Sequence, residues 1–160
     1  AKKESLIVVS NTSPIISFIE INELQILKKL FGKLFISTVV YEELKDKNQK
    51  QILNKEMSKG WIKVVKSPKL DLLYDIDEGE ATSISLALQH NKSILIVDDL
   101  EARGFAKEIG IEIVGTLGVL VLAKKMKLIP DLKSRINKLV KFRRFLSKDL
   151  INKVLKEANE

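Results

Sequence analysis

Side chains able to ligate a metal ion directly follow two buried strands that the sequence predicts. Asn11 comes after the aliphatic run at residues 6–9, and the pair Asp98 and Asp99 comes after the run at residues 94–97. Open parallel sheets carry their functional crevice beyond the carboxyl ends of the strands, where the strand order reverses. If the two strands are neighbours, the polar side chains that follow them meet in one pocket.

Two glutamates on helices add to this set. Glu43 lies on the helix expected after the second strand, and Glu80 begins the helix expected before the fourth. Carboxylates gathered in one crevice raise one another's pKa, so such a cluster persists most easily around a divalent cation. With no cysteine and a single histidine, His90, the ligands would be oxygen atoms. Oxygen ligands favour Mg²⁺ or Mn²⁺, and Mg²⁺ with acidic ligands usually acts on phosphates.

Each acid also has an interpretation without catalysis. Asp98 and Asp99 can cap the helix that follows them. Glu43 can be a solvated helix residue, and Glu80 can favour the helix dipole in a first turn. The shared position of the acids at one edge of the sheet favours the metal site. Two ions about 3.5–4 Å apart would activate water and stabilise the leaving oxygen of a phosphodiester.

The elements that must position these residues alternate between strand and helix. Aliphatic runs predict strands at 6–9, 34–36, 61–65, 94–97 and 111–114, and helical spacing predicts helices at 15–19, 23–30, 39–44, 45–59, 80–90, 101–109, 117–126, 132–142 and 146–155. Such alternation predicts parallel pairing through right-handed crossovers. We therefore expect an α/β fold, a doubly wound sheet with helices on both faces, in a single domain over residues 1–160.

The positive charge is concentrated in a helical carboxy-terminal segment, residues 121–160. This segment holds twelve Lys/Arg and four Asp/Glu, whereas the remainder holds sixteen and seventeen. A basic segment beside clustered acids suits a protein that binds a polyanion, although a lysine-rich solvated face gives the same composition. Arg143 and Arg144 suit a phosphate contact, a partner surface or an amphipathic surface helix. Arg103 can reach a scissile phosphate or pair with a nearby glutamate.

Neither targeting nor membrane insertion is expected from the hydropathy pattern. The first four residues include charges, and the apolar run that follows them has only the length of a strand. The longest apolar stretch, residues 113–123, is well short of the roughly 20 residues that span a bilayer. We therefore expect a cytoplasmic protein without a membrane partner.

Five segments occur in the order VVSNTSPII (8–16), VVYEEL (39–44), DEGEA (77–81), LIVDD (95–99) and VGTLGVL (114–120). Together they resemble the PIN-domain proteins, and most closely a small, mostly prokaryotic branch related to the toxin nucleases of toxin–antitoxin pairs. The resemblance implies a three-layer α/β/α sandwich with a mainly parallel five-stranded sheet in the order 3-2-1-4-5. It also implies a Mg²⁺- or Mn²⁺-dependent single-strand ribonuclease.

Individual residues can be matched to the family pattern. The family's acids fall on Asn11, Glu43, Glu80 and either Asp98 or Asp99, and the small hydroxyl residue that braces the first acid falls on Ser13. The toxin-like relatives suggest RNA as the substrate, a homodimer and a small antitoxin-like protein partner.

Asn11 departs from the family pattern, which has an aspartate there. Its amide oxygen can ligate a metal but brings no charge, so metal binding and water activation should weaken. Two functions stay open: a metal-dependent endoribonuclease that hydrolyses phosphodiester bonds of single-stranded RNA, or a catalytically weak or inactive PIN-like protein that binds nucleic acid or regulates. A receiver-like or phosphatase-like domain fits less well, because proteins of those families have aspartates after the first strand, where this chain has Asn11.

Overall fold

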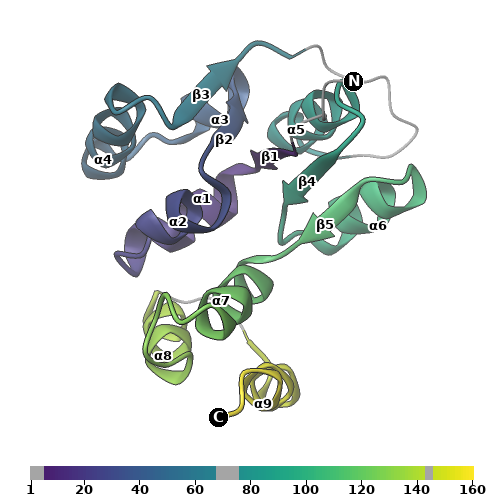
Figure 1. Ribbon diagram of the computed structural model, residues 1–160. Coiled ribbons are helices and arrows are strands. Elements are labelled where there is room, and N and C mark those ends of the chain that lie inside the picture. Colours follow the sequence, from purple (N-terminus) through teal and green to yellow (C-terminus); the bar gives the residue numbers. More distant parts are fainter. Residues whose placement is uncertain (1–5, 68–75, 143–145) are drawn as a thin grey trace, which may run out of the picture.

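A computed structural model describes residues 6–67, 76–142 and 146–160. Its strands are β1 (Ile7–Ser10), β2 (Leu34–Ser37), β3 (Ile62–Val65), β4 (Ser93–Ile96) and β5 (Glu112–Val114). They form one five-stranded sheet in the order β3-β2-β1-β4-β5, and all four neighbouring pairs are parallel (Figure 1). The predicted α/β class and strand order are therefore confirmed.

The helices follow the predicted pattern, with boundaries that shift by a few residues. They are α1 (Thr12–Glu20), α2 (Gln25–Phe31), α3 (Thr38–Glu43), α4 (Lys47–Ser58), α5 (Glu78–Leu88), α6 (Leu100–Glu108), α7 (Thr116–Lys125), α8 (Lys133–Lys141) and α9 (Lys148–Glu157). Side-chain caps fix several starts: Ser37 Oγ accepts from Val40 N at 3.1 Å, and Asp46 Oδ1 accepts from Gln49 N at 3.0 Å. One boundary corrects the sequence prediction, because α5 begins at Glu78 and Glu80 is its third residue.

Alternating side chains of the central strands divide the interior into two apolar cores. Val8 and Ile96 belong to the larger core, which includes buried residues of α1, α2, α7, α8 and α9. Val9 and Leu95 belong to the smaller core with α5 and α6. Because successive strand residues face opposite sides of a sheet, both faces are covered, as the long aliphatic runs predicted.

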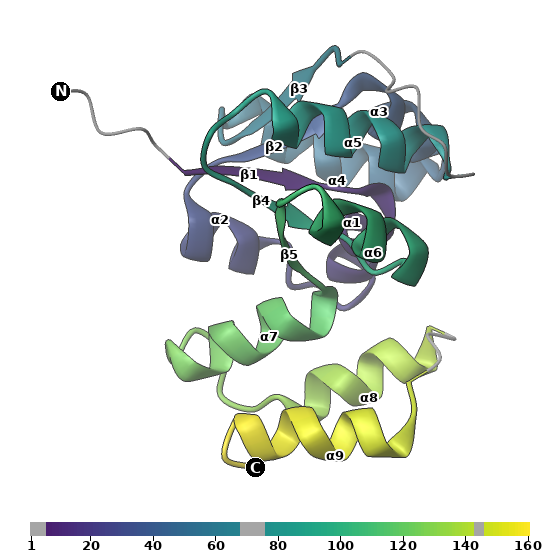
Figure 2. The ribbon, with the colours of Figure 1, turned by 90° about the vertical axis from the view of Figure 1, so that its right-hand side faces the viewer.

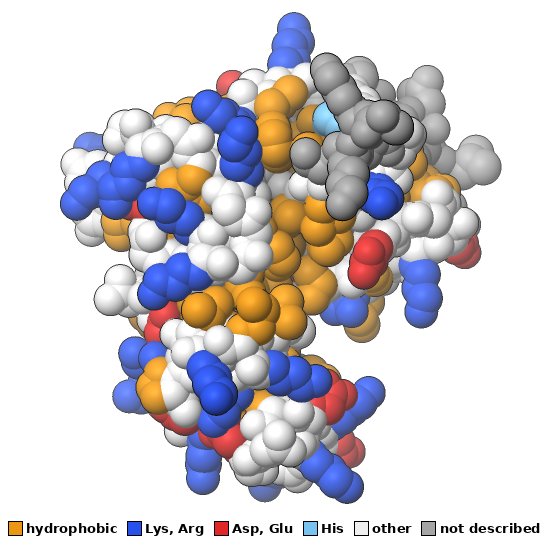
Figure 3. Space-filling view, viewed as in Figure 1, with side chains coloured by type: hydrophobic (Ala, Val, Ile, Leu, Met, Phe, Trp, Pro, Cys, Tyr) orange, Lys and Arg blue, Asp and Glu red, His pale blue; other side chains and the backbone are white. Residues whose placement is uncertain are grey.

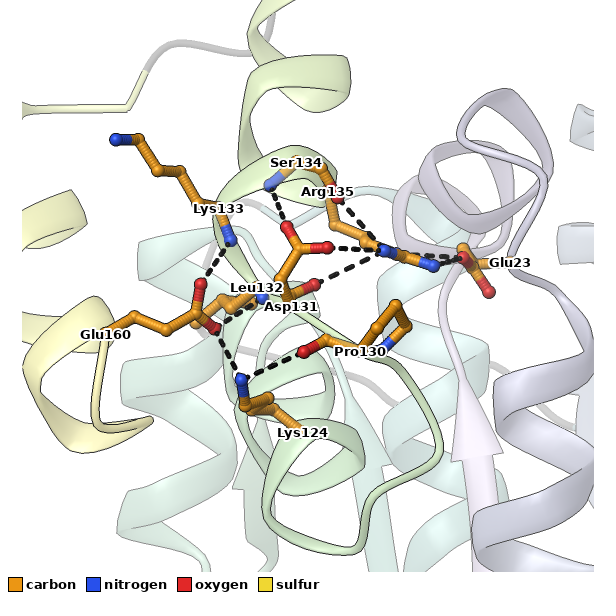
Figure 4. A network of polar contacts seen from close by, with 9 residues as sticks. All are labelled: Glu23, Lys124, Pro130, Asp131, Leu132, Lys133, Ser134, Arg135 and Glu160. Atoms are coloured by element: carbon orange, nitrogen blue, oxygen red, sulfur yellow. Dashed lines mark hydrogen bonds and ion pairs between the residues drawn. The ribbon is translucent and has the colours of Figure 1, made fainter.

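The carboxy-terminal helices lie together at one end of the molecule, away from α3 and α5 (Figures 1 and 2). A polar network ties them to one another and to the segment before α2 (Figure 4). Arg135 on α8 pairs with Glu23 at 2.9 Å, and Lys124 at the end of α7 pairs with Glu160 at 3.3 Å. Glu160 also accepts hydrogen bonds from the backbone N–H groups of Leu132 and Lys133, which lie at the start of α8.

The face drawn in Figure 3 carries cationic side chains over two separate regions. Lys and Arg side chains gather around the corner formed by α4 and β3 and around the carboxy-terminal helices, and apolar side chains occupy the hollow between them. Within the described ranges, no helix is long and apolar enough to cross a bilayer.

Candidate active site

Asn11 joins β1 to α1 at the carboxyl edge of the sheet. Its backbone N–H donates to the carbonyl oxygen of Ile96 at 3.0 Å, which continues the pairing of β1 with β4. The residue is only 5% exposed, and its side chain makes no capping hydrogen bond to α1 although Asn11 is the N-cap residue. Among the described residues, no donor reaches its Oδ1 atom. Since an unpaired buried acceptor costs about 1–3 kcal/mol, this oxygen is suited to a ligand that accepts its lone pair.

Glu43, the last residue of α3, lies against the amino-terminal ends of α1 and α5. Thr12 Oγ1 donates to its Oε2 atom at 2.8 Å. A Cβ atom added to Gly79 would lie 2.8 Å from both Cδ and Oε2 of Glu43, and closer still to Oε1. The carboxylate therefore rests directly on the α5 backbone, in a space that a side chain at position 79 would fill. The positive ends of the two helix dipoles favour a carboxylate at this point.

Glu80 experiences the summed negative charge of the site. Burial, followed by the charges of Asp99 and Asp77 and a smaller effect of Glu43, raises the pKa of Glu80 to about 7. A hydrogen bond from Asp77 N to Glu80 Oε2, at 3.2 Å, partly opposes this shift. Acids from α3, from α5 and from the turn after β4 thus lie within electrostatic reach of one another.

Asp98 and Asp99, which the sequence leaves equivalent, have different environments. Asp99 is the N-cap of α6, and its Oδ2 accepts from Ala102 N at 2.9 Å. Asp98 instead turns toward the start of α7, where its Oδ1 accepts from Thr116 N at 2.7 Å and its Oδ2 accepts from Thr116 Oγ1 at 2.6 Å. Asp99 therefore combines a capping role with an electrostatic effect on Glu80, whereas Asp98 is held by both donors of one threonine.

Arg103 approaches Asp98 through a space left by Gly115. A Cβ atom on Gly115 would lie 2.7 Å from the Nη1 atom of Arg103 and 3.0 Å from Oδ1 of Asp98. Ser13 lines the same cavity as Asp98 and Arg103. These positions are compatible with binding of an anionic group beside the carboxylates. Arg143 and Arg144, the other predicted substrate contacts, lie outside the described residues.

The candidate ligands lie near one another without forming a tight cluster. In the part of the chain that the structure describes, no group of three or more Asp, Glu or His side chains is placed to hold a metal ion. Glu43, Glu80, Asp98 and Asp99 each accept a hydrogen bond from a protein donor, which offsets the repulsion between like charges. Two features nevertheless fit a divalent cation. The unpaired Asn11 oxygen could act as a ligand, and the positive charge of the ion would oppose the rise in the pKa of Glu80.

Four residues of the site did not stand out in the sequence. Thr12 and Thr116 orient carboxylates, and Gly79 and Gly115 make room for charged groups. A signal was present in the Gly-Glu pair at 79–80 and in the Gly-Thr pair at 115–116, each at a predicted helix start. Neither pair reveals its long-range contact, because the partners are 12 or more residues away.

A family model agrees with the resemblance found in the sequence. The model of a family described as DUF3368, a PIN domain, matches residues 7–160. Among solved structures, the chain is similar to a PilT N-terminus domain protein from the hyperthermophilic archaeon Sulfolobus solfataricus P2, with a TM-score of 0.48 and 17% sequence identity. That similarity covers 74% of this chain and 92% of the other. A comparison with curated proteins gives no match.

Proposed function

Because the chain belongs to the DUF3368 family of PIN domains, we propose that it is a metal-dependent endoribonuclease that hydrolyses phosphodiester bonds of single-stranded RNA. PIN domains generally depend on divalent metal ions. The observation that carries the proposal is the buried, unpaired Oδ1 atom of Asn11, at the sheet edge where Glu43, Glu80, Asp98 and Asp99 also lie. An amide oxygen beside carboxylates is a donor set for Mg²⁺ or Mn²⁺.

Some of the site residues would bind the metal ion, and others would bind the substrate. Asn11, Glu43, Glu80 and one or both of Asp98 and Asp99 would bind Mg²⁺ or Mn²⁺. Thr12 and Thr116 fix two of these carboxylates, and each carboxylate retains further lone pairs after accepting a hydrogen bond. When bound, the ion would supply positive charge that polarises the phosphate and lowers the pKa of a water molecule. Arg103 would bind a phosphate oxygen, because its guanidinium lies beside Asp98.

The carboxy-terminal helices provide the charge for a polyanionic substrate. Lys138 and Lys141 near the end of α8 and Lys148 and Lys153 on α9 are exposed. Arg135 does not add to this surface, since it is half-buried and paired with Glu23 and Asp131. Lysine contacts with phosphates would make RNA binding weaken as salt concentration rises.

Cleavage of a labelled single-stranded RNA with Mn²⁺ or with EDTA tests the proposal. We expect cleavage only with metal, and loss of cleavage in Glu43→Gln. The matched control is Glu42→Gln, because Glu42 is an exposed carboxylate on the same helix that makes none of the contacts described for Glu43. Absence of metal-dependent cleavage by the unmodified protein, or equal activity in both variants, would contradict the proposal.

Asn11 itself favours a second candidate function, RNA binding with little or no cleavage. Without the charge of an aspartate, the ion would be held less tightly and the water activated less strongly. Under this alternative, the unmodified protein binds RNA without cleaving it, and Asn11→Asp gains metal-dependent cleavage. Failure of the unmodified protein to bind single-stranded RNA at low salt would rule out both functions.

A further inference from the structure

A cavity of about 550 Å³ lies beside the candidate active site. Its walls come from α1, from the turn after β4, from β5, and from parts of α6, α7, α8 and α9, so it lies between the sheet edge and the helices α8 and α9. Asp98 and Arg103 belong both to this cavity and to the candidate active site. A molecule bound in the cavity would therefore be continuous with one bound at the carboxylates.

The lining of the cavity combines apolar walls with a few polar groups. Leu117, Leu139, Leu146 and Leu150 are among the apolar residues of the lining. Ser13 and Ser17, which lie one helical turn apart on α1, are polar residues of the same wall. Small-molecule sites have this size and this mixture of lining groups. A nucleobase matches it, because its faces are apolar and its edges carry hydrogen-bonding groups.

The mouth of the cavity has properties that also suit a nucleotide. Leu100, the first residue of α6, is 84% exposed although it directly follows Asp99. A large apolar side chain held in solvent beside an acidic site gains nothing from folding, but it can cover the face of a base. Lys138, Lys141 and Lys148 are exposed on α8 and α9, the helices that form one wall, so the surroundings complement a phosphate chain.

From these observations we propose that the cavity accepts one unstacked base of single-stranded RNA, with the adjoining phosphate beside Arg103 and Asp98. This inference rests on the proposed function and assigns a base-binding subsite to it. Bases in a duplex are stacked and paired, so they cannot enter such a cavity without being flipped out. The subsite thus gives a physical reason for preferring single-stranded over double-stranded RNA.

Nucleosides provide a test that needs neither metal nor cleavage. Adenosine, cytidine, guanosine and uridine are titrated separately into ¹⁵N-labelled protein, and ribose serves as the matched probe without a base. We expect at least one nucleoside to bind about tenfold more tightly than ribose, the gain expected from burying roughly 50 Å² of apolar surface. The amide signals of Ser17, Gly118 and Leu139 should shift. Shifts confined to other regions, or none with any nucleoside, would overturn the proposal.

Two leucine variants test whether the wall of the cavity is responsible. Leu150 lines the cavity and is 39% exposed, whereas Leu122 on α7 is 38% exposed and lies outside the cavity lining. We expect Leu150→Ala to weaken nucleoside binding several-fold and Leu122→Ala to leave it unchanged, with both variants retaining their melting transitions. Equal affinity in both variants would contradict a base subsite at this wall. If Leu150→Ala unfolds, Leu100→Ala at the exposed mouth provides the second comparison with Leu122→Ala.

The outcome also separates this inference from the proposed function and from a protein occupant. RNA cleavage without selective nucleoside binding in the cavity would leave the ribonuclease standing and refute the base subsite. Nucleoside binding in the cavity without metal-dependent cleavage would support the base subsite and refute the ribonuclease. A dimer that Leu150→Ala converts to a monomer, measured by light scattering, would show that a second copy covers the cavity and would overturn the proposal.

Discussion

Replacement of Gly79 by alanine should disturb the candidate active site while leaving the fold nearly as stable as before. The added Cβ atom would lie 2.8 Å from Cδ of Glu43 and closer to Oε1, so one of the two residues must move. Gly79 is part of the α5 backbone, whereas the Glu43 carboxylate is the free end of a long side chain. The side chain should therefore rotate away, and its hydrogen bond from Thr12 should break.

The opposing contributions to stability are similar in size. Loss of the Thr12–Glu43 hydrogen bond costs about 1–2 kcal/mol, and the exchange of glycine for alanine in a helix returns about 0.5–1 kcal/mol. The free energy of unfolding should thus fall by no more than about 1.5 kcal/mol. Metal affinity should fall by about tenfold or more, because misplacing a ligating carboxylate typically costs this much.

Urea unfolding and calorimetric titration with Mn²⁺ measure these two effects separately. Gly104→Ala is the matched control, since Gly104 lies within α6 and an added Cβ atom would meet nothing within 4 Å. It should gain about 0.5–1 kcal/mol in stability and keep the original Mn²⁺ affinity. Unchanged Mn²⁺ affinity in Gly79→Ala would refute the placement of Glu43 in the metal site. A loss of stability above about 3 kcal/mol would show that α5 had moved instead.

Three further perturbations test other parts of the site. The pKa of Glu80 is raised to about 7 in the folded protein, so its contribution to the free energy of unfolding is fully present below pH 4.5 and is lost as pH rises through 7. The urea midpoints of Glu80→Gln should therefore depend less on pH than those of the unmodified protein. Asn11→Asp should lower the melting temperature without metal and raise Mn²⁺ affinity at least about tenfold in calorimetry, because it adds a charge where the side chain is buried. Thr116→Val should cost about 1–2 kcal/mol in urea unfolding by removing a hydrogen bond to Asp98, and Thr116→Ser should restore it; equal stability of the two variants would contradict this.

The sheet and the position of its acidic edge were predictable because both depend on local pattern and topology. Aliphatic runs specify strands buried on both faces, as Val8 and Val9 show by entering different cores. Alternation with helices requires parallel pairing, and parallel strands bring their carboxyl ends to one edge. The strand order itself came from the family resemblance, because the alternation alone permits several orders.

The details of the site depended on contacts that no local pattern contains. Asp98 and Asp99 are adjacent and chemically identical, and only the arrival of Thr116 distinguishes them. The basic composition of the carboxy-terminal segment likewise did not reveal that Arg135 is committed to Glu23, a residue 112 positions earlier in the chain. Such pairings follow from how α8 packs on the body of the protein, which composition does not specify.

The candidate active site gathers negative charge at the starts of several helices. Asn11, Asp99 and Gly115 are the N-caps of α1, α6 and α7, and Glu80 lies in the first turn of α5, so several helix dipoles direct their positive ends to this edge. The hydrogen bonds from these helix starts offset part of the repulsion between the carboxylates. Asn11 reduces that repulsion further, because it places a neutral group at the most buried of the candidate ligand positions. We therefore expect the protein to be stable without metal and to bind the ion more weakly than an aspartate at position 11 would allow, which makes Asn11 a residue that favours stability over metal affinity.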